Sequence, residues 1–211
     1  MAILDDATKK QVKEILGEMQ DNVEILFFDK PGTQYGKEIE ALLDELSELS
    51  EKLNVKKLDE NAKDEIEKYK IDKFPAIVIN GKNKGLIRFF GIPSGYEFAT
   101  LLEDLVMTSK GESGLSKDIE DYVKNLNQKV HLMVFVTPTC PYCPRSVRFA
   151  HQIAMLNENV TGDMIEAIEF PELSDKFHVS GVPHNVVNEK HEFVGAYPPE
   201  MAIEEIKKAL Q

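Results

Sequence analysis

The chain repeats one pattern in its two halves. Three pairs of segments match in the same order: VEILFF at 23–28 with VHLMVF at 130–135, EKYKIDKFPAIVIN at 67–80 with DKFHVSGVPHNVVN at 175–188, and FFG at 89–91 with FVG at 193–195. The first match places TQYG at 33–36 opposite CPYC at 140–143. Similarity in a fixed order indicates duplication of a structural unit. The chain is therefore predicted to fold as two copies of one unit.

Each half is predicted to alternate helices and strands. An amphipathic helix leads into a strand, a loop with the four-residue motif, a second helix, a second strand and a short helix. Two more strands follow Pro75 or Pro183, and a last helix closes the unit. The predicted helices are 5–20, 34–52, 61–69, 95–106, 116–126, 141–157, 172–178 and 199–210, and the predicted second strands are 55–59 and 164–168. In the first helix we expect Ile15, Leu16 and Met19 to face inward.

This order of elements predicts an α/β fold with two tandem units, each a mixed central sheet of about four strands flanked by helices. The segment SKGESG at 109–114 has the small, polar composition of a domain junction. We therefore expect an N-terminal unit at 1–110, which contains no cysteine, and a C-terminal unit at 111–211, which contains the CPYC motif.

Composition limits the functions that the chain can have. A hydrophobic content of 42% suffices for a buried core, and the net charge of -12 argues against nucleic acid, whose phosphates require clustered Lys and Arg. The sequence shows no apolar run of about 18 residues and no secretory leader, so we expect no membrane partner and a cytoplasmic location. The Lys- and Glu-rich composition without Trp is in keeping with a thermophilic source.

Both cysteines of the chain lie in one CxxC motif. The cytosol keeps thiols reduced unless they are catalytic or bind metal, so a structural disulfide is not expected. A redox pair is the leading interpretation. A zinc site, an iron–sulfur cluster bridged between two molecules and an inert pair remain as alternatives. Zinc would need two further donors, and the sequence has no second CxxC and no CxxH or HxxxH partner among its histidines.

The surroundings of the motif resemble the thioredoxin fold. In that fold a CxxC stands where a strand meets a helix, and a proline that is normally cis precedes a later strand, as Val182-Pro183 does here. CPYC is the tetrapeptide typical of dithiol glutaredoxins. Two such units in one chain resemble the protein disulfide oxidoreductase family of thermophilic archaea and bacteria, also described as glutaredoxin-like proteins. The resemblance covers essentially the whole chain and implies two tandem thioredoxin-like units.

The chain departs from that family at Thr33 and Gly36, since members often carry a CxxC in both units. A pair in the second unit alone also resembles the N-terminal region of the flavin-dependent subunit of alkyl hydroperoxide reductase, where the pair relays electrons to a peroxiredoxin. The first unit is then either a packing partner for the second or a docking surface around Tyr35, Phe74 and Pro75. The segment IPSGYEF at 92–98 is expected only to begin a helix.

Thiol–disulfide exchange requires a thiolate, which the start of a helix stabilises through its free N–H groups and dipole. Cys140 is expected just ahead of a helix that begins near Pro141, which makes Cys140 the attacking thiol and Cys143 the resolving one. The predicted substrate-binding residues are Pro141, Tyr142, Val182 and Pro183, of which the last two form a substrate lip, and the candidate modulators are Arg145 and His184. Val134 stands where thioredoxins carry a buried Asp, which leaves the proton acceptor for Cys143 unassigned.

These residues predict an enzyme that reduces or exchanges protein disulfides without a bound cofactor. The expected partners are disulfide-containing proteins, among them a peroxiredoxin, and a thioredoxin-reductase-like flavoprotein that supplies electrons, because the chain has no Gly-rich dinucleotide fingerprint of its own. The alternative functions are a glutathione-dependent glutaredoxin and a metal or iron–sulfur carrier. The direction of electron flow depends on the redox potential, which spans roughly 150 mV among related folds.

Overall fold

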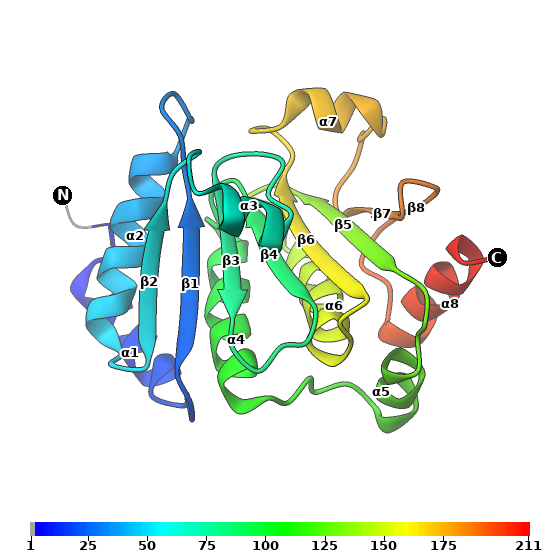
Figure 1. Cartoon of the computed structure of the whole chain (residues 1–211), viewed down its shortest axis with the longest axis horizontal. Coiled ribbons are helices and arrows are strands. Elements are labelled where there is room, and N and C mark those ends of the chain that lie inside the picture. Colours follow the sequence, from blue (N-terminus) through cyan, green and yellow to red (C-terminus); the bar gives the residue numbers. More distant parts are fainter. Residues whose placement is uncertain (1–2) are drawn as a thin grey trace.

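One continuous sheet runs through the chain. The computed structural model describes residues 3–211 and joins the strands in the order β2-β1-β3-β4-β6-β5-β7-β8 (Figure 1). The strands are β1 (Val23–Phe28), β2 (Leu53–Leu58), β3 (Ala76–Asn80), β4 (Leu86–Phe90), β5 (Val130–Val136), β6 (Val160–Glu166), β7 (His184–Val187) and β8 (His191–Val194). The first four and the last four strands are arranged alike, so the predicted α/β architecture and four strands per unit are confirmed.

The two halves join head to tail. The last strand of the first half, β4, pairs in parallel with β6, the second strand of the second half. Strand β1 is parallel to β2 and antiparallel to β3, and the second half repeats this with β5, β6 and β7. Because β1, β4, β5 and β6 consequently run in one direction, the loops after β1 and β5, which carry the two four-residue motifs, leave the sheet at the same edge.

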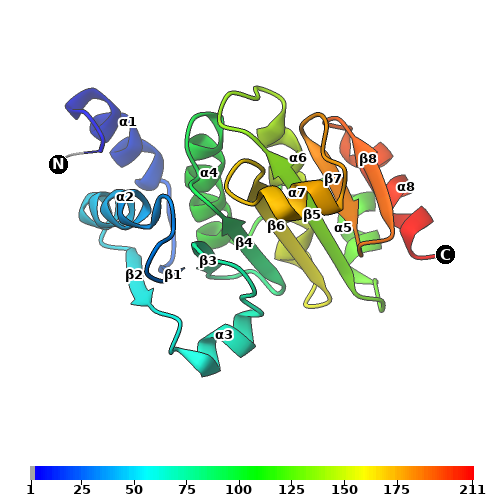
Figure 2. The ribbon, with the colours of Figure 1, turned by 90° about the horizontal axis from the view of Figure 1, so that it is seen from above.

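Two sets of helices cover the two faces. Helices α1 (Asp6–Leu16), α2 (Gly36–Leu49), α4 (Tyr96–Lys110), α5 (Lys117–Lys124), α6 (Cys143–Leu156) and α8 (Pro199–Ala209) contribute to the larger core, and α3 (Lys63–Tyr69) and α7 (Pro171–Lys176) border the smaller one. Figure 2 shows α3 on the opposite side of the sheet from α1, α2 and α4. Residues 109–110 of the predicted junction belong to α4, and the domain boundary after residue 110 stays a prediction.

The core follows from alternation along the strands. In β5, Leu132, Val134 and Val136 face the larger core, whereas Met133 and Phe135 face the smaller one. A strand buried on both faces is apolar along most of its length, which explains the apolar run LMVFV at 132–136.

Some details of the predicted elements are wrong. Ile15 is 37% exposed, because α1 turns Val12 and Leu16 inward instead. Strand β6 begins at Val160 rather than at 164, since its first residues include Gly162 and Asp163, which are weak strand formers. A side chain at Gly162 would collide with the backbone of Ala150 in α6, so the close approach of that helix accounts for the glycine.

Asp163 on β6 is a buried charged residue at the place where the two halves meet. Its carboxylate accepts hydrogen bonds from Arg88 Nε and Nη2 at 2.7 Å each, and Arg88 Nη1 donates to the carbonyl of Tyr69 at 3.1 Å. The ring of His131 lies 2.5 Å from the same carboxylate. Although burial alone raises the pKa of Asp163, Arg88 and His131 together hold it well below its usual range. The two halves are thus connected by a backbone ladder and by a paired internal charge.

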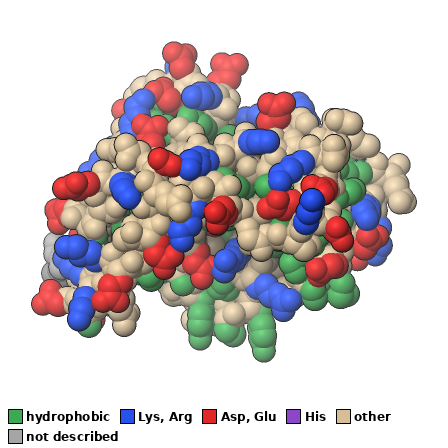
Figure 3. Space-filling model, turned by 90° about the horizontal axis from the view of Figure 1, so that it is seen from below, with side chains coloured by type: hydrophobic (Ala, Val, Ile, Leu, Met, Phe, Trp, Pro, Cys, Tyr) green, Lys and Arg blue, Asp and Glu red, His purple; other side chains and the backbone are tan. Residues whose placement is uncertain are grey.

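The surface mixes charges of both signs. Figure 3 shows Lys and Arg side chains interspersed with Asp and Glu on the face seen from below. Within residues 3–211, no helix combines the length and the apolar character that crossing a bilayer requires.

Candidate active site

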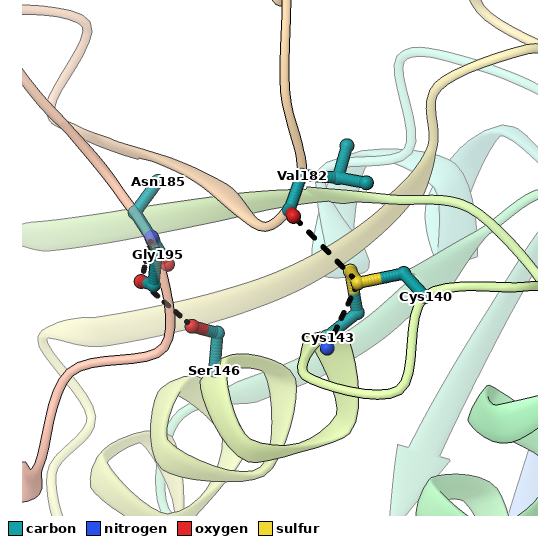
Figure 4. The surroundings of a disulfide bond; sticks show 6 residues. All are labelled: Cys140, Cys143, Ser146, Val182, Asn185 and Gly195. Carbon is teal, nitrogen blue, oxygen red and sulfur yellow. Dashed lines mark hydrogen bonds between the residues drawn. A yellow bond between two sulfur atoms is a disulfide. The ribbon is translucent and has the colours of Figure 1, made fainter.

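Cys140 and Cys143 form a disulfide at the start of α6 (Figure 4). Their Cα atoms are 5.5 Å apart, and the pair lies at the sheet edge where β5 ends. Cys140 is 7% exposed and Cys143 is fully buried. Of the two sulfur atoms, that of Cys140 is therefore the more accessible to a partner.

The main chain surrounds the sulfur of Cys140 with polar groups. The backbone N–H of Cys143 donates to Cys140 Sγ at 3.2 Å, and the carbonyl oxygen of Val182 lies 3.7 Å from the same sulfur. The N–H of Cys140 itself donates to the carbonyl of Thr137 at 3.1 Å. An N–H directed at sulfur stabilises a thiolate, so this position suits the attacking cysteine.

The helix begins two residues later than the sequence predicts. Residues 141–142 form a turn, Tyr142 occupies the N-cap position, and α6 starts at Cys143. The proline in the first helical turn is consequently Pro144 and not Pro141. Both Pro141 and Tyr142 are exposed, Tyr142 to 70%.

The segment of Val182 and Pro183 faces the disulfide. The peptide bond between these two residues is cis, and the carbonyl of Pro183 accepts a hydrogen bond from the N–H of Gly195 at 2.8 Å. The carbonyl of Gly195 in turn accepts from Asn185 Nδ2 at 3.1 Å and from Ser146 Oγ of α6 at 3.5 Å (Figure 4). These bonds tie the segment to the helix that carries Cys143.

The two candidate modulators, Arg145 and His184, differ in exposure and in their position relative to the sheet. Arg145 is exposed on α6, two residues from Cys143 in the sequence. His184 is buried on the other face of the sheet, where its ring meets the edge of Phe135 at a centroid distance of 6.1 Å and its Nε2 lies 3.0 Å from Glu192. Because both cysteines belong to the larger core and Phe135 to the smaller one, the strand separates His184 from the disulfide.

The first half presents the corresponding loop without sulfur. Helix α2 begins at Gly36 with Tyr35 as its N-cap residue, just as α6 begins at Cys143 with Tyr142. Thr33 Oγ1 donates to Asp29 Oδ1 at 2.6 Å, and the ammonium of Lys30 lies 5.4 Å from the ring centre of Phe74. The bond between Phe74 and Pro75 is cis, as in the second half.

Glu97 is a site residue that the sequence analysis did not identify. The segment at 92–98 does begin a helix, but Glu97 in its first turn is 1% exposed. The N–H of the preceding Tyr96 donates to the carbonyl of Pro138, in the loop just before Cys140, at 3.2 Å. Gly95 has φ +60 and no side chain, and a Cβ there would overlap that same carbonyl. The start of α4 is therefore packed directly on the loop of the disulfide.

Burial raises the pKa of Glu97 to about 7. The hydroxyl of Thr100 and the ring of His151 oppose the shift in part, and Asp104 adds to it. Within residues 3–211, neither carboxylate oxygen of Glu97 has a hydrogen-bond partner, although the hydroxyl of Thr100 is close enough to favour the ionised form of Glu97. In the sequence this Glu looks like an ordinary first-turn acid of a helix, so only its burial distinguishes it. In the same part of the chain, no three His, Cys, Asp or Glu side chains gather as metal ligands.

The chain is similar to known proteins in sequence and in fold. Residues 130–208 match the family model of the thioredoxin domain. The alkyl hydroperoxide reductase AhpF of Staphylococcus aureus is 29% identical over 189 residues, which are 88% of this chain and 34% of that protein. The chain thus spans about a third of the length of the curated relatives that it matches.

Solved structures share the whole architecture. A protein disulfide oxidoreductase from Aeropyrum pernix superposes with a TM-score of 0.90 at 28% identity, covering 99% of this chain and 95% of the other. A domain of the alkyl hydroperoxide reductase AhpF from Enterococcus faecalis has a TM-score of 0.87 at 24% identity, covering 96% and 99%, and supports the fold.

The fold and the disulfide at the start of α6 define a thiol–disulfide oxidoreductase with one CxxC redox pair. The chain is similar over nearly its whole length to a protein disulfide oxidoreductase, consists of two tandem thioredoxin-like units, and carries its single CxxC in the second unit. The family resemblance and the general activity predicted from the sequence are thereby confirmed.

Proposed function

We propose that the chain passes electrons from a flavoprotein reductase to the disulfides of partner proteins, with Cys140 as the attacking and Cys143 as the resolving cysteine. The observation that carries this assignment is the asymmetry of the pair. Cys140 is the more exposed of the two, and its sulfur accepts the N–H of Cys143, whereas Cys143 is fully buried. A partner sulfur therefore has access to Cys140 first.

The exchange proceeds in two displacements. The Cys140 thiolate attacks one sulfur of the partner disulfide, which forms a mixed disulfide and releases the other partner sulfur as a thiolate. Cys143 then attacks Cys140 Sγ, which forms the internal disulfide and releases the second partner thiolate. The partner has gained two electrons and the chain has lost two. A reductase returns them by the reverse exchange.

Pro141, Tyr142, Val182 and Pro183 are assigned as the substrate-binding residues, with Val182 and Pro183 as the substrate lip. Tyr142 is largely exposed beside the pair, and the main chain of Val182 lies against Cys140 Sγ. An extended partner segment can pair with a main chain presented in this way, which aligns its disulfide with the attacking sulfur. The hydrogen bonds from Gly195 to Pro183 and from Ser146 to Gly195 support the lip from behind.

Glu97 is the proposed proton acceptor for Cys143. A buried thiol must lose its proton before it attacks, and Val134 leaves the site without the acid that thioredoxins use. Glu97 is buried, has no bonding partner within residues 3–211, and begins the helix that packs on the loop before Cys140. A pKa of about 7 allows this carboxyl to accept and return a proton near neutrality.

The likeness to the alkyl hydroperoxide reductase AhpF supports the choice of partners. We assign the electron supply to a thioredoxin-reductase-like flavoprotein, and a peroxiredoxin is the first acceptor to examine. The cytoplasm, which keeps thiols reduced, is the compartment in which such a pair would cycle.

The identity of the electron donor distinguishes this function from a glutathione-dependent glutaredoxin and from a metal or cluster carrier. Reduction of insulin by the chain is measured with NADPH and a thioredoxin-reductase-type flavoprotein, and separately with glutathione. Faster turnover with the flavoprotein supports the proposal. Turnover with glutathione alone would overturn it in favour of a glutaredoxin. Absence of turnover with both donors, together with metal absorbance in anaerobically purified protein, would identify a metal or cluster carrier. The potential of the pair against dithiol buffers then gives its direction.

A further inference from the structure

A second group of ionisable residues lies buried where the two units meet. Helix α4 of the first unit packs against α6 of the second, and between them Asp104 and His151 are 1% and 0% exposed. His151 Nδ1 lies 2.5 Å from Asp104 Oδ2. Glu97 stands on the same helix as Asp104, two turns closer to the disulfide loop.

Several polar atoms of this group have no partner. Within residues 3–211 these atoms are both carboxylate oxygens of Glu97, Oδ1 of Asp104, Nε2 of His151 and the hydroxyl of Thr100. Buried polar atoms are almost always hydrogen-bonded, because an unpaired one loses the hydration it had in water. Apolar residues of similar size would stabilise the same interface at least as well. The unpaired atoms therefore call for an explanation other than stability.

The ring of His151 has a fixed orientation. Its edge meets the ring of Phe89 at a centroid distance of 4.9 Å, and Gly162 of β6 lies so close that an added Cβ would be 3.1 Å from the ring. With the ring held between β4, β6 and Asp104, its charge acts on Glu97 from one constant position.

Few other charges act on the group. Burial raises the pKa of Asp104, and Arg148 on α6 opposes that shift only from the surface, where it forms an ion pair with Glu103 of α4. On the strands beneath, Arg88 and Asp163 face the smaller core. The neighbouring helices bury only apolar side chains, Val12 and Leu16 on α1 and Ile119 and Val123 on α5. Besides burial and Thr100, the influences on Glu97 are thus a cation at His151 and an anion at Asp104.

We propose that the pair of Asp104 and His151 positions the proton of Glu97 and thereby sets the rate at which Cys143 resolves the mixed disulfide. This inference rests on the proposed role of Glu97. When Cys143 attacks, its thiol proton passes to the Glu97 carboxylate. When the internal disulfide is later reduced, Glu97 returns that proton to the Cys143 thiolate. His151 and Asp104 exchange no electrons, and act only through their charge.

The first unit thereby takes part in the reaction. Glu97 and Asp104 come from α4, within the predicted N-terminal unit, and His151 comes from the helix that carries Cys143. The unit without cysteines then supplies the acid and base groups for the unit that has them.

A chromogenic aryl disulfide separates the two displacements. The reduced chain releases one coloured thiolate when Cys140 attacks and a second when Cys143 resolves the mixed disulfide, and stopped flow resolves the two phases. In His151→Gln, the first phase should keep its rate. The pH midpoint of the second phase should rise by about one unit, because the cation that favours ionised Glu97 is lost, and the second phase should slow about tenfold below the midpoint.

His131→Gln is the matched control. It also removes a ring that lies 2.5 Å from a buried aspartate at the join, but on the other face of the sheet. If loosening of the join is what matters, both variants change the second phase alike, and the inference is overturned. An unshifted midpoint in His151→Gln overturns it as well.

Asp104→Asn tests the same pair in case the His151 variant does not fold. This change removes the anion that raises the pKa of Glu97, so the midpoint should move downward, opposite to the shift in His151→Gln. The titration of Glu97 in the oxidised chain, followed by carboxyl NMR, should show the same shifts without any turnover. Glu97→Gln separates the role of Glu97 from that of the pair of Asp104 and His151. If it leaves the second phase unchanged, the role of Glu97 fails. If it slows that phase while the His151 and Asp104 variants shift nothing, only the pair fails.

Discussion

In the first unit, the carboxylate of Asp29 fills the space that a side chain on Gly36 would need. A Cβ at Gly36 would overlap Asp29 Oδ2 and also meet the hydroxyl of Thr33, which donates to the same carboxylate. Gly36 corresponds to Cys143 and Thr33 to Cys140, so a hydrogen bond stands here where the second unit has its disulfide.

Restoring cysteines in the first unit should therefore fail unless Asp29 is also changed. In a chain with Cys140→Ser and Cys143→Ser, the double change Thr33→Cys and Gly36→Cys should leave two free thiols after mild oxidation. Adding Asp29→Ala should let a disulfide form. Thiol titration before and after oxidation measures both outcomes, and a disulfide that forms without the Asp29 change would show that the carboxylate is no obstacle.

The two cysteines should give different products when each is replaced. Cys140→Ser should abolish reduction of insulin, because the accessible sulfur is gone. Cys143→Ser should retain the first attack and accumulate a mixed disulfide, since nothing resolves it. Mass spectrometry under non-reducing conditions detects the adduct. An adduct in the Cys140 variant, and none in the Cys143 variant, would reverse the assignment of roles.

Glu97 should make the wild-type chain less stable as the pH rises. Its pKa is raised in the folded chain to about 7 from an ordinary 4.5, so the folded state binds its proton more tightly than the unfolded state between these values. Its contribution is present at low pH and is lost as the pH rises toward 7. Glu97→Gln should thus raise the free energy of unfolding by ~1–3 kcal/mol at pH ~8 and change little at pH ~5.

Urea unfolding of wild type and Glu97→Gln at the two pH values measures this difference. Glu103→Gln, on the exposed side of the same helix in a surface ion pair, is the control and should change stability by less than ~1 kcal/mol at either pH. Equal effects of Glu97→Gln at both pH values would exclude the raised pKa as their cause.

Asp163→Asn should be among the most destabilising conservative changes in the chain. It leaves the buried guanidinium of Arg88 without its counter-charge, at a cost of ~3–5 kcal/mol. Because the pKa of Asp163 is held low, the stability it provides is present above pH ~4 and is lost as the pH falls below. Denaturant unfolding is the measurement. Asp44→Asn, which breaks a surface pair with Lys57, should cost no more than ~1 kcal/mol.

The sequence predicts the features that repeat. Strand β1 begins and ends where the pattern VEILFF does, and both Pro75 and Pro183 precede a strand, because apolar runs and prolines act locally. The CPYC motif identified the redox pair, since both cysteines lie within one turn of chain and need no distant partner to be recognised.

The sequence could not reveal what depends on packing between the halves. Glu97, Asp104 and Arg88 look like solvated charges in the sequence, because a helix or strand pattern does not say which polar residues a second unit will cover. Gly162 weakened the prediction of β6 for the same reason, as only the approach of α6 explains it. The pairing of β4 with β6 could not be predicted either, because the pattern within one unit does not show which strand of the other unit it meets.

Charged residues on β4 and β6 determine which strands can pair where the two units join. Arg88 on β4 occupies the position that Glu192 holds on the free edge strand β8, and Asp163 on β6 occupies that of Lys56 on the free edge strand β2. Pairing of β4 with a β2 strand would set Arg88 against Lys56, and pairing of β6 with a β8 strand would set Glu192 against Asp163. Like charges thus oppose each unit joining a copy of itself, while opposite charges favour its sister. After duplication, the two units have thus diverged until each pairs better with the other than with a copy of itself.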